Sequence, residues 1–183
     1  MNKKLYFLSI HTPMGLEKDI LKLKNEIKDR FQSEKALRLP GHITLFRPTW
    51  IEESLEEELV AKVAEFVHDQ KPFQVELLDF GAFTPRTVYI RVIPNPALTQ
   101  LKHKLDKVVE QIILPEEEQA KENKTFVPHI TIANRDLKSN KFREAWDEFQ
   151  HRNFEGSFKV MEVHLLKHNG KRWEVLKVFP LQS

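Results

Sequence analysis

Two short stretches of the chain decide the fold: His42-Ile43-Thr44-Leu45-Phe46 and Pro128-His129-Ile130-Thr131-Ile132. Each contains the triplet His-Ile-Thr among strand-forming residues. Along a β-strand, residues i and i+2 point to the same face of the sheet. Each triplet therefore presents an imidazole and a hydroxyl on one face and turns its isoleucine to the other. The sequence predicts two strands, each with a polar face and a core face.

The same order of elements surrounds both triplets. Apolar periodicity predicts strand, helix, His-Ile-Thr strand, helix and strand in each half of the chain. The expected elements are strand 5–10, helix 16–31, strand 42–47 ended by Pro48, helix 52–66, strand 73–80 ended by a turn or bulge at Gly81, strand 87–93, helix 96–112, a mobile loop 115–125, strand 129–133, a short helix 142–149, and strands 154–166 and 173–181. This approximate duplication indicates a single α+β domain, 1–183, with lobes of roughly 1–84 and 85–183 related by a pseudo-two-fold axis.

Such lobes would bring the two His-Thr pairs together across a cleft. Two imidazoles that titrate near pH 6.5 can act as general base and general acid, and two hydroxyls can hold phosphoryl oxygens. This set suits metal-independent hydrolysis of a phosphodiester, with His42 and His129 as catalytic residues and Thr44 and Thr131 as phosphate ligands. The alternative is that both histidines are partly buried strand residues bonded to a neighbour. The repetition of the triplet in matched context favours the catalytic interpretation.

Composition narrows the function further. With 183 residues, a net charge of +2 and no cysteine, the chain is not suited to a broad grip on nucleic acid, thiol catalysis or a thiolate metal site. His164 and His168 are four residues apart on an expected strand, roughly 13 Å, too far to share a metal. We expect no metal and no cofactor. The apolar run 5–10 is too short for a signal peptide or membrane helix, so we expect a cytoplasmic protein. The sequence leaves the oligomeric state open, with a monomer as the default expectation.

The paired motifs resemble those of the 2H phosphoesterase superfamily, and in particular its "2'-5' RNA ligase" branch, also called RNA 2',3'-cyclic phosphodiesterases. Further similar segments are 5–10, 80–83, 87–92, 126–135 and 173–181. The resemblance implies a bilobal duplicated fold in which two antiparallel-rich sheets flank a central cleft, with helices outside. It also implies hydrolysis of 2',3'-cyclic phosphates, at RNA ends or on nucleotides, to 2'-phosphates. Some members join RNA ends through a 2'-5' bond. Phe46-Arg47-Pro48 departs from the Phe-Leu-Gly common in relatives, so the substrate is less determined than the reaction.

Four other residues are candidates for the site. Arg135 has the parity of His129 and matches a motif arginine, so it is expected to bind phosphate; the alternative is a surface residue at the strand end. Phe46, Tyr89 and Phe126 are candidates for stacking on a base. Ordinary packing is the alternative for each of them. Arg47 is left out because its parity in a regular strand points away from the cleft.

Two other functions remain open from the sequence. One is a non-catalytic module that binds RNA ends or nucleotides. The other is a 2H enzyme for another cyclic phosphate or a 2'-5'-linked oligonucleotide. The near symmetry of the motifs leaves the acid and base roles of His42 and His129 undecided, although the resemblance favours His42 as the acid. The expected partners are RNA ends or cyclic nucleotides, not a membrane.

Overall fold

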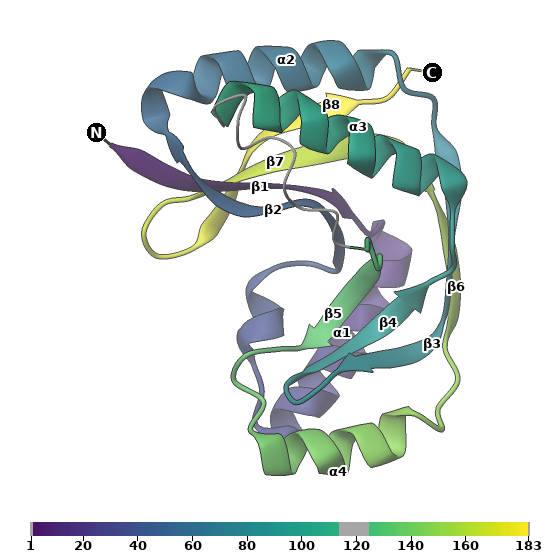
Figure 1. Ribbon diagram of the computed structural model, residues 1–183. Coiled ribbons are helices and arrows are strands. Elements are labelled where there is room, and N and C mark those ends of the chain that lie inside the picture. The colour runs from purple at the N-terminus through teal and green to yellow at the C-terminus, as the bar shows by residue number, and fades with distance from the viewer. Residues whose placement is uncertain (1, 114–124, 183) are drawn as a thin grey trace.

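A computed structural model describes residues 2–113 and 125–182. The expected loop 115–125 therefore lies outside the described residues except for Thr125. In chain order the elements are β1 (Lys3–His11), α1 (Met14–Phe31), η1 (Lys35–Arg38), β2 (His42–Glu52), η2 (Glu53–Leu55), α2 (Glu56–His68), β3 (Phe73–Phe83), β4 (Thr87–Val92), α3 (Pro96–Ile113), β5 (His129–Ala133), α4 (Ser139–Phe149), β6 (Glu155–Val160), β7 (Glu162–His168) and β8 (Trp173–Pro180) (Figure 1).

The strands form one curled antiparallel sheet in the order β6-β3-β4-β5-β2-β1-β7-β8. The expected α+β fold with antiparallel-rich sheets and outer helices is confirmed. The two sheets of the expectation are two halves of a continuous sheet, β6-β3-β4-β5 and β2-β1-β7-β8. They meet where β2 lies beside β5, through the single register pair Ile43–Ile130. The two His-Ile-Thr strands are therefore the junction between the halves.

The halves of the sheet do not follow halves of the chain. The expected boundary between residues 84 and 85 falls in the hairpin that joins β3 to β4, and these two strands are hydrogen-bonded neighbours. The C-terminal strands β7 and β8 return to lie beside β1. The expected strand 154–166 is broken at Met161, because β6 pairs with β3 and β7 pairs with β1. The strands thus pass from one half to the other twice, between β2 and β3 and between β6 and β7.

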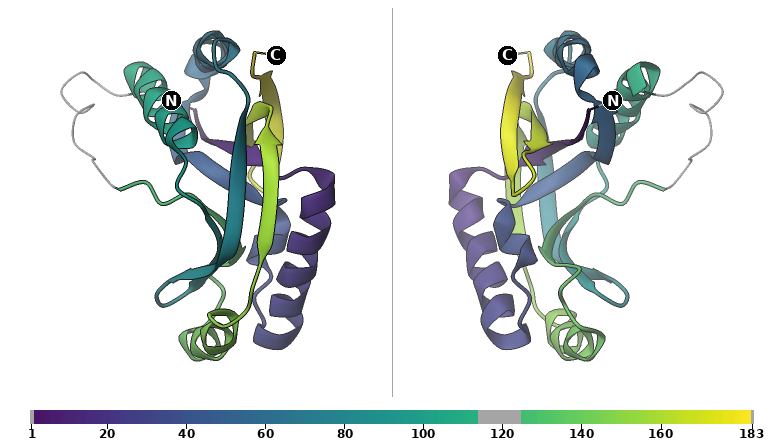
Figure 2. Two further views of the ribbon diagram at one scale, coloured as in Figure 1. Left: turned by 90° about the vertical axis from the view of Figure 1, so that its right-hand side faces the viewer. Right: turned by 90° about the vertical axis from the view of Figure 1, so that its left-hand side faces the viewer.

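The helices cross over in the same way. Helix α1 follows β1 but packs against β5 and α4, in the other half. Helix α3 follows β4 but packs against β2 and α2. Figures 1 and 2 show α2 and α3 side by side over one half, with α1 and α4 on the other. Each half of the sheet is therefore covered partly by a helix that follows, in the chain, a strand of the other half.

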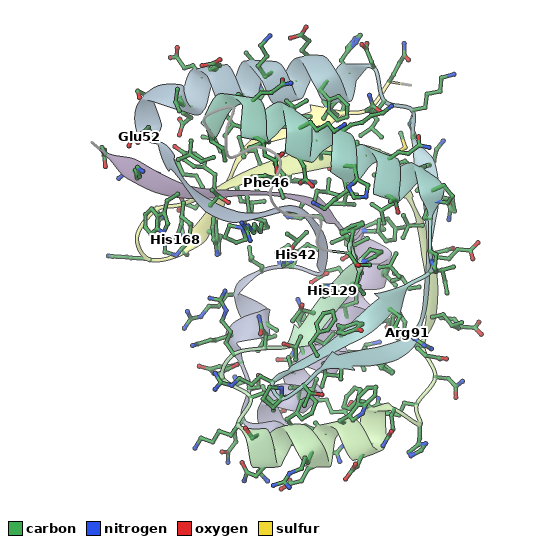
Figure 3. All side chains as sticks on the ribbon, in the orientation of Figure 1. His42, Phe46, Glu52, Arg91, His129 and His168 are labelled. Carbon is green, nitrogen blue, oxygen red and sulfur yellow. The ribbon has the colours of Figure 1, made fainter. Side chains whose placement is uncertain are left out.

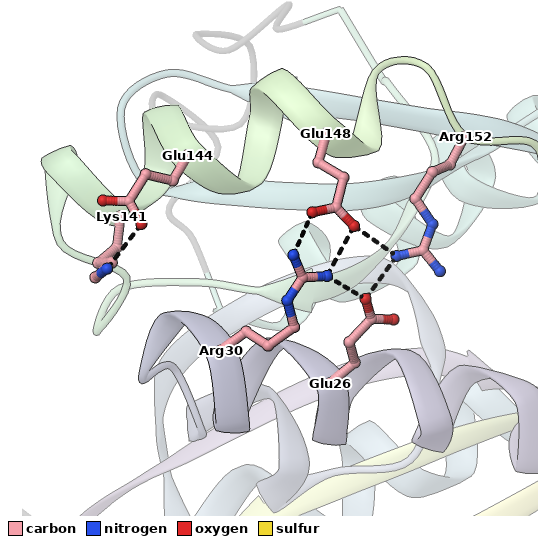
Figure 4. A network of polar contacts seen from close by, with 6 residues as sticks. All are labelled: Glu26, Arg30, Lys141, Glu144, Glu148 and Arg152. Carbon is pink, nitrogen blue, oxygen red and sulfur yellow. Dashed lines mark hydrogen bonds and ion pairs between the residues drawn. The ribbon is translucent and has the colours of Figure 1, made fainter.

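Ion pairs tie α1 to α4 (Figure 4). Arg30 donates to both carboxylate oxygens of Glu148, at 2.8 and 2.5 Å. Glu26 accepts from Arg30 at 2.7 Å and from Arg152 at 2.8 Å. A single exposed ion pair contributes little, about 0–1 kcal/mol, but these four groups form a network. The network joins the two helices at the surface.

Two expected strand ends are wrong. Pro48 lies inside β2, where Arg47 and Pro48 have no register partner in β1. A proline is tolerated at such an irregularity because no ladder hydrogen bond is required of it. Gly81 also lies inside a strand, β3, opposite Tyr89.

Across the described residues, no helix combines the length and apolar character that crossing a bilayer requires.

The junction pair should dominate stability. Ile43 and Ile130 are fully buried, at 0% exposure each. Ile43→Ala removes three carbons from this packed junction and should lower the free energy of unfolding by about 2–5 kcal/mol. Urea denaturation measures the loss.

The control is Leu176→Ala on the edge strand β8, where the side chain is 37% exposed. We expect a change nearer about 0.5 kcal/mol for it. Equal losses in the two variants would contradict the importance assigned to the junction.

Candidate active site

The junction of β2 and β5 brings the two triplets together. Because Ile43 pairs with Ile130 in antiparallel register, His42 lies across from Thr131 and Thr44 across from His129. Residues directly opposite each other share a face of the sheet. The isoleucines point to the buried side, so the four polar side chains share the opposite side. Figure 3 shows His42 and His129 together where the halves meet. The predicted convergence of the two pairs is present, and each histidine adjoins the other motif's threonine.

Both imidazoles are oriented by the same local contact. His42 Nδ1 lies 2.8 Å from the Pro40 carbonyl, and His129 Nδ1 lies 2.7 Å from the Val127 carbonyl. A carbonyl oxygen only accepts, so Nδ1 donates in each ring. In the neutral ring the lone pair is then on Nε2, the nitrogen away from the backbone. Each Nε2 can take a proton, or donate one when the ring is charged.

Burial shifts both rings toward the neutral form. It lowers the pKa of His42 to about 4, with the nearby charges of Lys24 and His129 acting in the same direction. The hydrogen bond to Pro40 partly opposes this shift. Burial likewise lowers the pKa of His129, opposed by the hydrogen bond to Val127. Because the two rings repel when both are charged, the site favours no more than one imidazolium at a time.

Aromatic rings border each histidine. The Phe7 ring centroid lies 5.7 Å from that of His42. Phe83 and Tyr89 each lie 5.0 Å from His129 and 4.5 Å from one another. These rings contribute to the burial that lowers the pKa values of both imidazoles.

A cavity of about 520 Å³ opens beside His129 and Thr44, between β2, α3 and the segment that leads into β5. Its side chains are mixed in character. Phe46, Phe83 and Phe126 are apolar and flat, while Arg47, Lys102 and His103 are basic or titratable, and Asp106 and Glu110 are acidic. Such a lining suits a ligand with both a flat apolar part and a charged part.

The candidate stacking residues have different positions. Tyr89 is 8% exposed, packed on Gly81 and against His129. Phe126 lines the cavity and has Lys102 over its ring at 5.7 Å. Phe46 is 8% exposed in the core and also borders the cavity. Its expected parity with His42 is wrong, because Leu8 pairs with Phe46 while Ser9 pairs with Thr44. The bulge at Leu45 turns Phe46 to the face of Ile43.

Arg135 lies two residues beyond the end of β5 and is exposed. Its φ of 52° places it in the left-handed region, so the strand parity that linked it to His129 does not extend this far. The next residue, Asp136, accepts from the backbone N–H of Glu34 and of Lys35, at 2.8 and 2.9 Å. This contact fixes the turn that carries Arg135. A phosphate role for Arg135 stays a prediction.

Sequence reasoning missed several residues near the site. Arg47 lines the cavity because irregular register around the bulge replaces the regular parity on which it was excluded. Arg91 faces His129 across β4 and β5, and its guanidinium donates to the Leu78 carbonyl at 3.2 Å. Lys102 and His103 reach the cavity from α3. The sequence places both residues on one helix, but it does not show that this helix packs against β2, because that contact is long-range.

Among the residues that the structure describes, no group of three or more His, Asp or Glu side chains is placed to hold a metal ion. His164 and His168 lie on β7, as expected for a strand. His164 is stacked on His11 at 4.0 Å rather than paired with His168.

Comparison with known proteins agrees with this geometry. Residues 15–172 match the sequence pattern of the 2'-5' RNA ligase superfamily. The chain belongs to the 2'-5' RNA ligase superfamily. The resemblance to the 2H phosphoesterases indicated by the paired motifs is confirmed. No curated protein sequence matches the chain significantly.

Solved structures share the fold of this superfamily member at low identity. Escherichia coli LigT in complex with 3'-AMP superposes with a TM-score of 0.73 at 20% identity, covering 100% of both chains. A protein described as a phosphoesterase gives 0.74 at 20%, also over 100% of both chains. The Thermus thermophilus protein TT0787 gives 0.70 at 20%, over 98% of each chain. The likeness extends over the whole fold.

Gly81 should be essential for the position of Tyr89 in this 2'-5' RNA ligase superfamily member. A Cβ at Gly81 would lie 2.5 Å from the Tyr89 ring, closer than real contacts allow. We expect Gly81→Ala to displace the ring, and with it the ring-current shift of the His129 Hε1 signal in NMR spectra.

Gly15→Ala is the control, since a Cβ there meets nothing within 4 Å. It should leave the His129 signal in place. An unmoved signal in Gly81→Ala would show that the ring does not depend on this glycine.

Proposed function

We propose that the protein is a metal-independent phosphodiesterase that hydrolyses 2',3'-cyclic phosphates to 2'-phosphates. The observation that carries this proposal is the crosswise set of two imidazoles and two hydroxyls at the junction of β2 and β5. In both rings Nδ1 is bound to a backbone carbonyl, which leaves Nε2 for the substrate. A site that only bound a phosphate would gain little from two such rings with lowered pKa values.

The proposed reaction uses one proton donor and one acceptor. One Nε2 removes a proton from water as its oxygen attacks phosphorus, in line with the bond from phosphorus to O3'. That bond breaks, and the other Nε2–H gives its proton to the departing O3'. Thr44 and Thr131 donate hydrogen bonds to the non-bridging oxygens, where negative charge develops. The product is a 2'-phosphate with a free 3'-hydroxyl, and proton exchange with solvent restores the rings.

The same groups would support ligation. If the 5'-hydroxyl of an RNA takes the place of water, the attack forms a 2'-5' phosphodiester and the proton transfers are unchanged. Microscopic reversibility then requires that the site also cleave such a bond. The choice between water and hydroxyl depends on which nucleophile the cavity beside Thr44 and His129 admits.

The proposed substrate is a nucleotide or an RNA end. Solved structures of E. coli LigT hold 3'-AMP, ATP and phosphate, which supports a nucleotide phosphate here. The cavity beside His129 offers Phe126 to a base, and Lys102 or Arg47 to a phosphate. A net charge of +2 favours local recognition of an end over a grip along a strand. The proposed enzyme acts in the cytoplasm as a monomer.

Removing either imidazole should abolish turnover. We expect His42→Ala and His129→Ala each to lower kcat by at least about 10²–10⁴-fold, because each takes one proton-transfer step from the reaction. Hydrolysis of 2',3'-cyclic nucleotides and of a short RNA with a cyclic end, followed by product analysis, measures this. Wild-type activity should persist in EDTA.

His68→Ala, at an exposed position on α2, is the control and should keep wild-type activity. Circular dichroism checks the fold of each variant. If the wild type binds a cyclic-phosphate oligonucleotide but forms no product, the chain is a binding module. If it turns over another cyclic phosphate or a 2'-5' oligonucleotide instead, the substrate assignment is wrong while the site is right.

The pH profile should be bell-shaped and displaced to the acid side. Burial lowers the pKa of both imidazoles, so the ring that acts as the acid loses its proton at a lower pH than an ordinary histidine near 6.5. We expect kcat/KM, which reports the free enzyme, to peak below about pH 6.5. A bound phosphodiester anion stabilises imidazolium, so kcat should peak at a higher pH than kcat/KM. Steady-state kinetics across the acidic and neutral range measure both, and a kcat/KM that still rises above about pH 6.5 would contradict the assignment.

A further inference from the structure

We propose that Glu17 and Lys24 on α1 are positioning residues that hold the turn before β2, and through its Pro40 carbonyl the catalytic ring of His42. This inference rests on the proposed function only for its kinetic consequence. The contacts themselves concern the turn of residues 39–41.

Glu17 binds one side of this turn. Its carboxylate accepts from the backbone N–H of Gly41 at 2.7 Å and from the Thr12 hydroxyl at 2.7 Å. The Thr12 backbone N–H donates in turn to the Gly41 carbonyl at 2.9 Å. Both backbone polar groups of Gly41 are therefore bound, and both contacts lead back to the start of α1.

Lys24 binds the other side. It is 1% exposed, and its ammonium donates to the Leu39 carbonyl at 2.9 Å. Burying a lysine is costly, so its retention calls for a reason. The residues before and after Pro40 are thus each bound by a charged side chain of α1. The Pro40 carbonyl and the Gly41 N–H belong to one planar peptide unit, so the bond from Gly41 to Glu17 holds the plane of the carbonyl that accepts from His42, while Lys24 holds the preceding unit by its Leu39 carbonyl.

The backbone at Gly41 lies directly against this support. A Cβ there would lie 2.8 Å from Thr12 Oγ1, 2.9 Å from Glu17 Oε2 and 2.9 Å from Ile20 Cδ1. Nothing larger than glycine fits without moving the carboxylate or the helix. The approach of Ile20 Cδ1, which takes no part in the hydrogen bonds, also places the turn directly against α1.

The other histidine is supported differently. The Val127 carbonyl that orients His129 lies next to Phe126, whose ring has Lys102 of α3 over it at 5.7 Å. Lys102 is also paired with Asp106. The sequence motifs are alike, but the polar contacts to the backbone found at Leu39 and Gly41 belong to the first motif.

The two α1 charges act on His42 in opposite directions. Lys24 lowers the pKa of His42 and Glu17 raises it. The other titratable groups that face this ring are His11 from β1, at 6.3 Å between ring centroids, and His129 from β5. His164 of β7 is stacked on His11. Removal of one α1 charge at a time therefore removes one of two opposed contributions to the pKa of His42.

The test compares Lys24→Met and Glu17→Gln with the wild type, with Lys22→Met as the matched control. Met and Gln approximate the length of the residues they replace. Lys22 is on the same helix with a side chain 78% exposed. Two quantities are measured: the pKa of the His42 ring from its NMR titration, and kcat and KM against pH for cyclic-phosphate hydrolysis.

We expect Lys24→Met to raise the His42 pKa and Glu17→Gln to lower it. Both should lower kcat by about tenfold or more with a smaller change in KM, because a misplaced ring costs rate more than affinity. The limb of the kcat/KM profile that His42 controls should move with its pKa, up in the first variant and down in the second. Lys22→Met should change none of these.

A purely structural role predicts something else. General loosening would expose the ring and raise its pKa toward the ordinary value in both variants. The same direction of shift in both, no shift in either, or an equal effect of Lys22→Met would overturn the proposal. If Lys24→Met does not fold, Glu17→Gln decides alone: a lowered His42 pKa with reduced kcat supports the proposal, and a raised or unchanged pKa refutes it. The titration needs no substrate, so it is informative even if the wild type proves inactive on cyclic phosphates.

Discussion

Ile43 and Ile130 face each other in the single register pair that joins β2 to β5, and the rest of the structure depends on this contact. Below the sheet, the two side chains close the core between the halves, since both are fully buried. Above it, the same register sets each histidine opposite the other motif's threonine. A shift of one residue in this pairing would turn every side chain of the shifted motif to the other face of the sheet. Hydrophobic packing on one side of the sheet thereby sets the geometry of the proposed catalytic groups on the other.

Much of this could be predicted because it depends on local period. The i, i+2 rule gave the shared face of His42 and Thr44, and helical spacing gave the four α-helices. What failed depends on contacts distant in sequence. The bulge at Leu45, which turns Phe46 to the core face, exists only against the register of β1. Arg135 was placed by extending a strand that ends at Ala133. The pairing of β7 with β1, and of β8 with β7, could not be predicted from local pattern because β7 pairs with a strand distant in sequence.

Identical motifs do not make identical sites. His42 and His129 share a backbone contact to the residue two positions earlier, so their orientation was repeated along with the strand. Their surroundings differ. Glu17 and the buried Lys24 bind the turn before His42, whereas the rings of Phe83 and Tyr89 border His129. Two groups that must carry opposite protonation states benefit from such differences. The asymmetry lies in the helices and neighbouring strands and not in the triplets themselves.

The crossover of helices has a mechanical consequence. Helix α1 follows a strand of one half of the sheet and packs on the other half, and α3 does the reverse. The two halves are therefore interlocked by these helices. They cannot swing apart about a hinge without unpacking a helix from its sheet. For the proposed reaction, which depends on the placement of two protons, such interlocking would help to keep the two imidazoles in position.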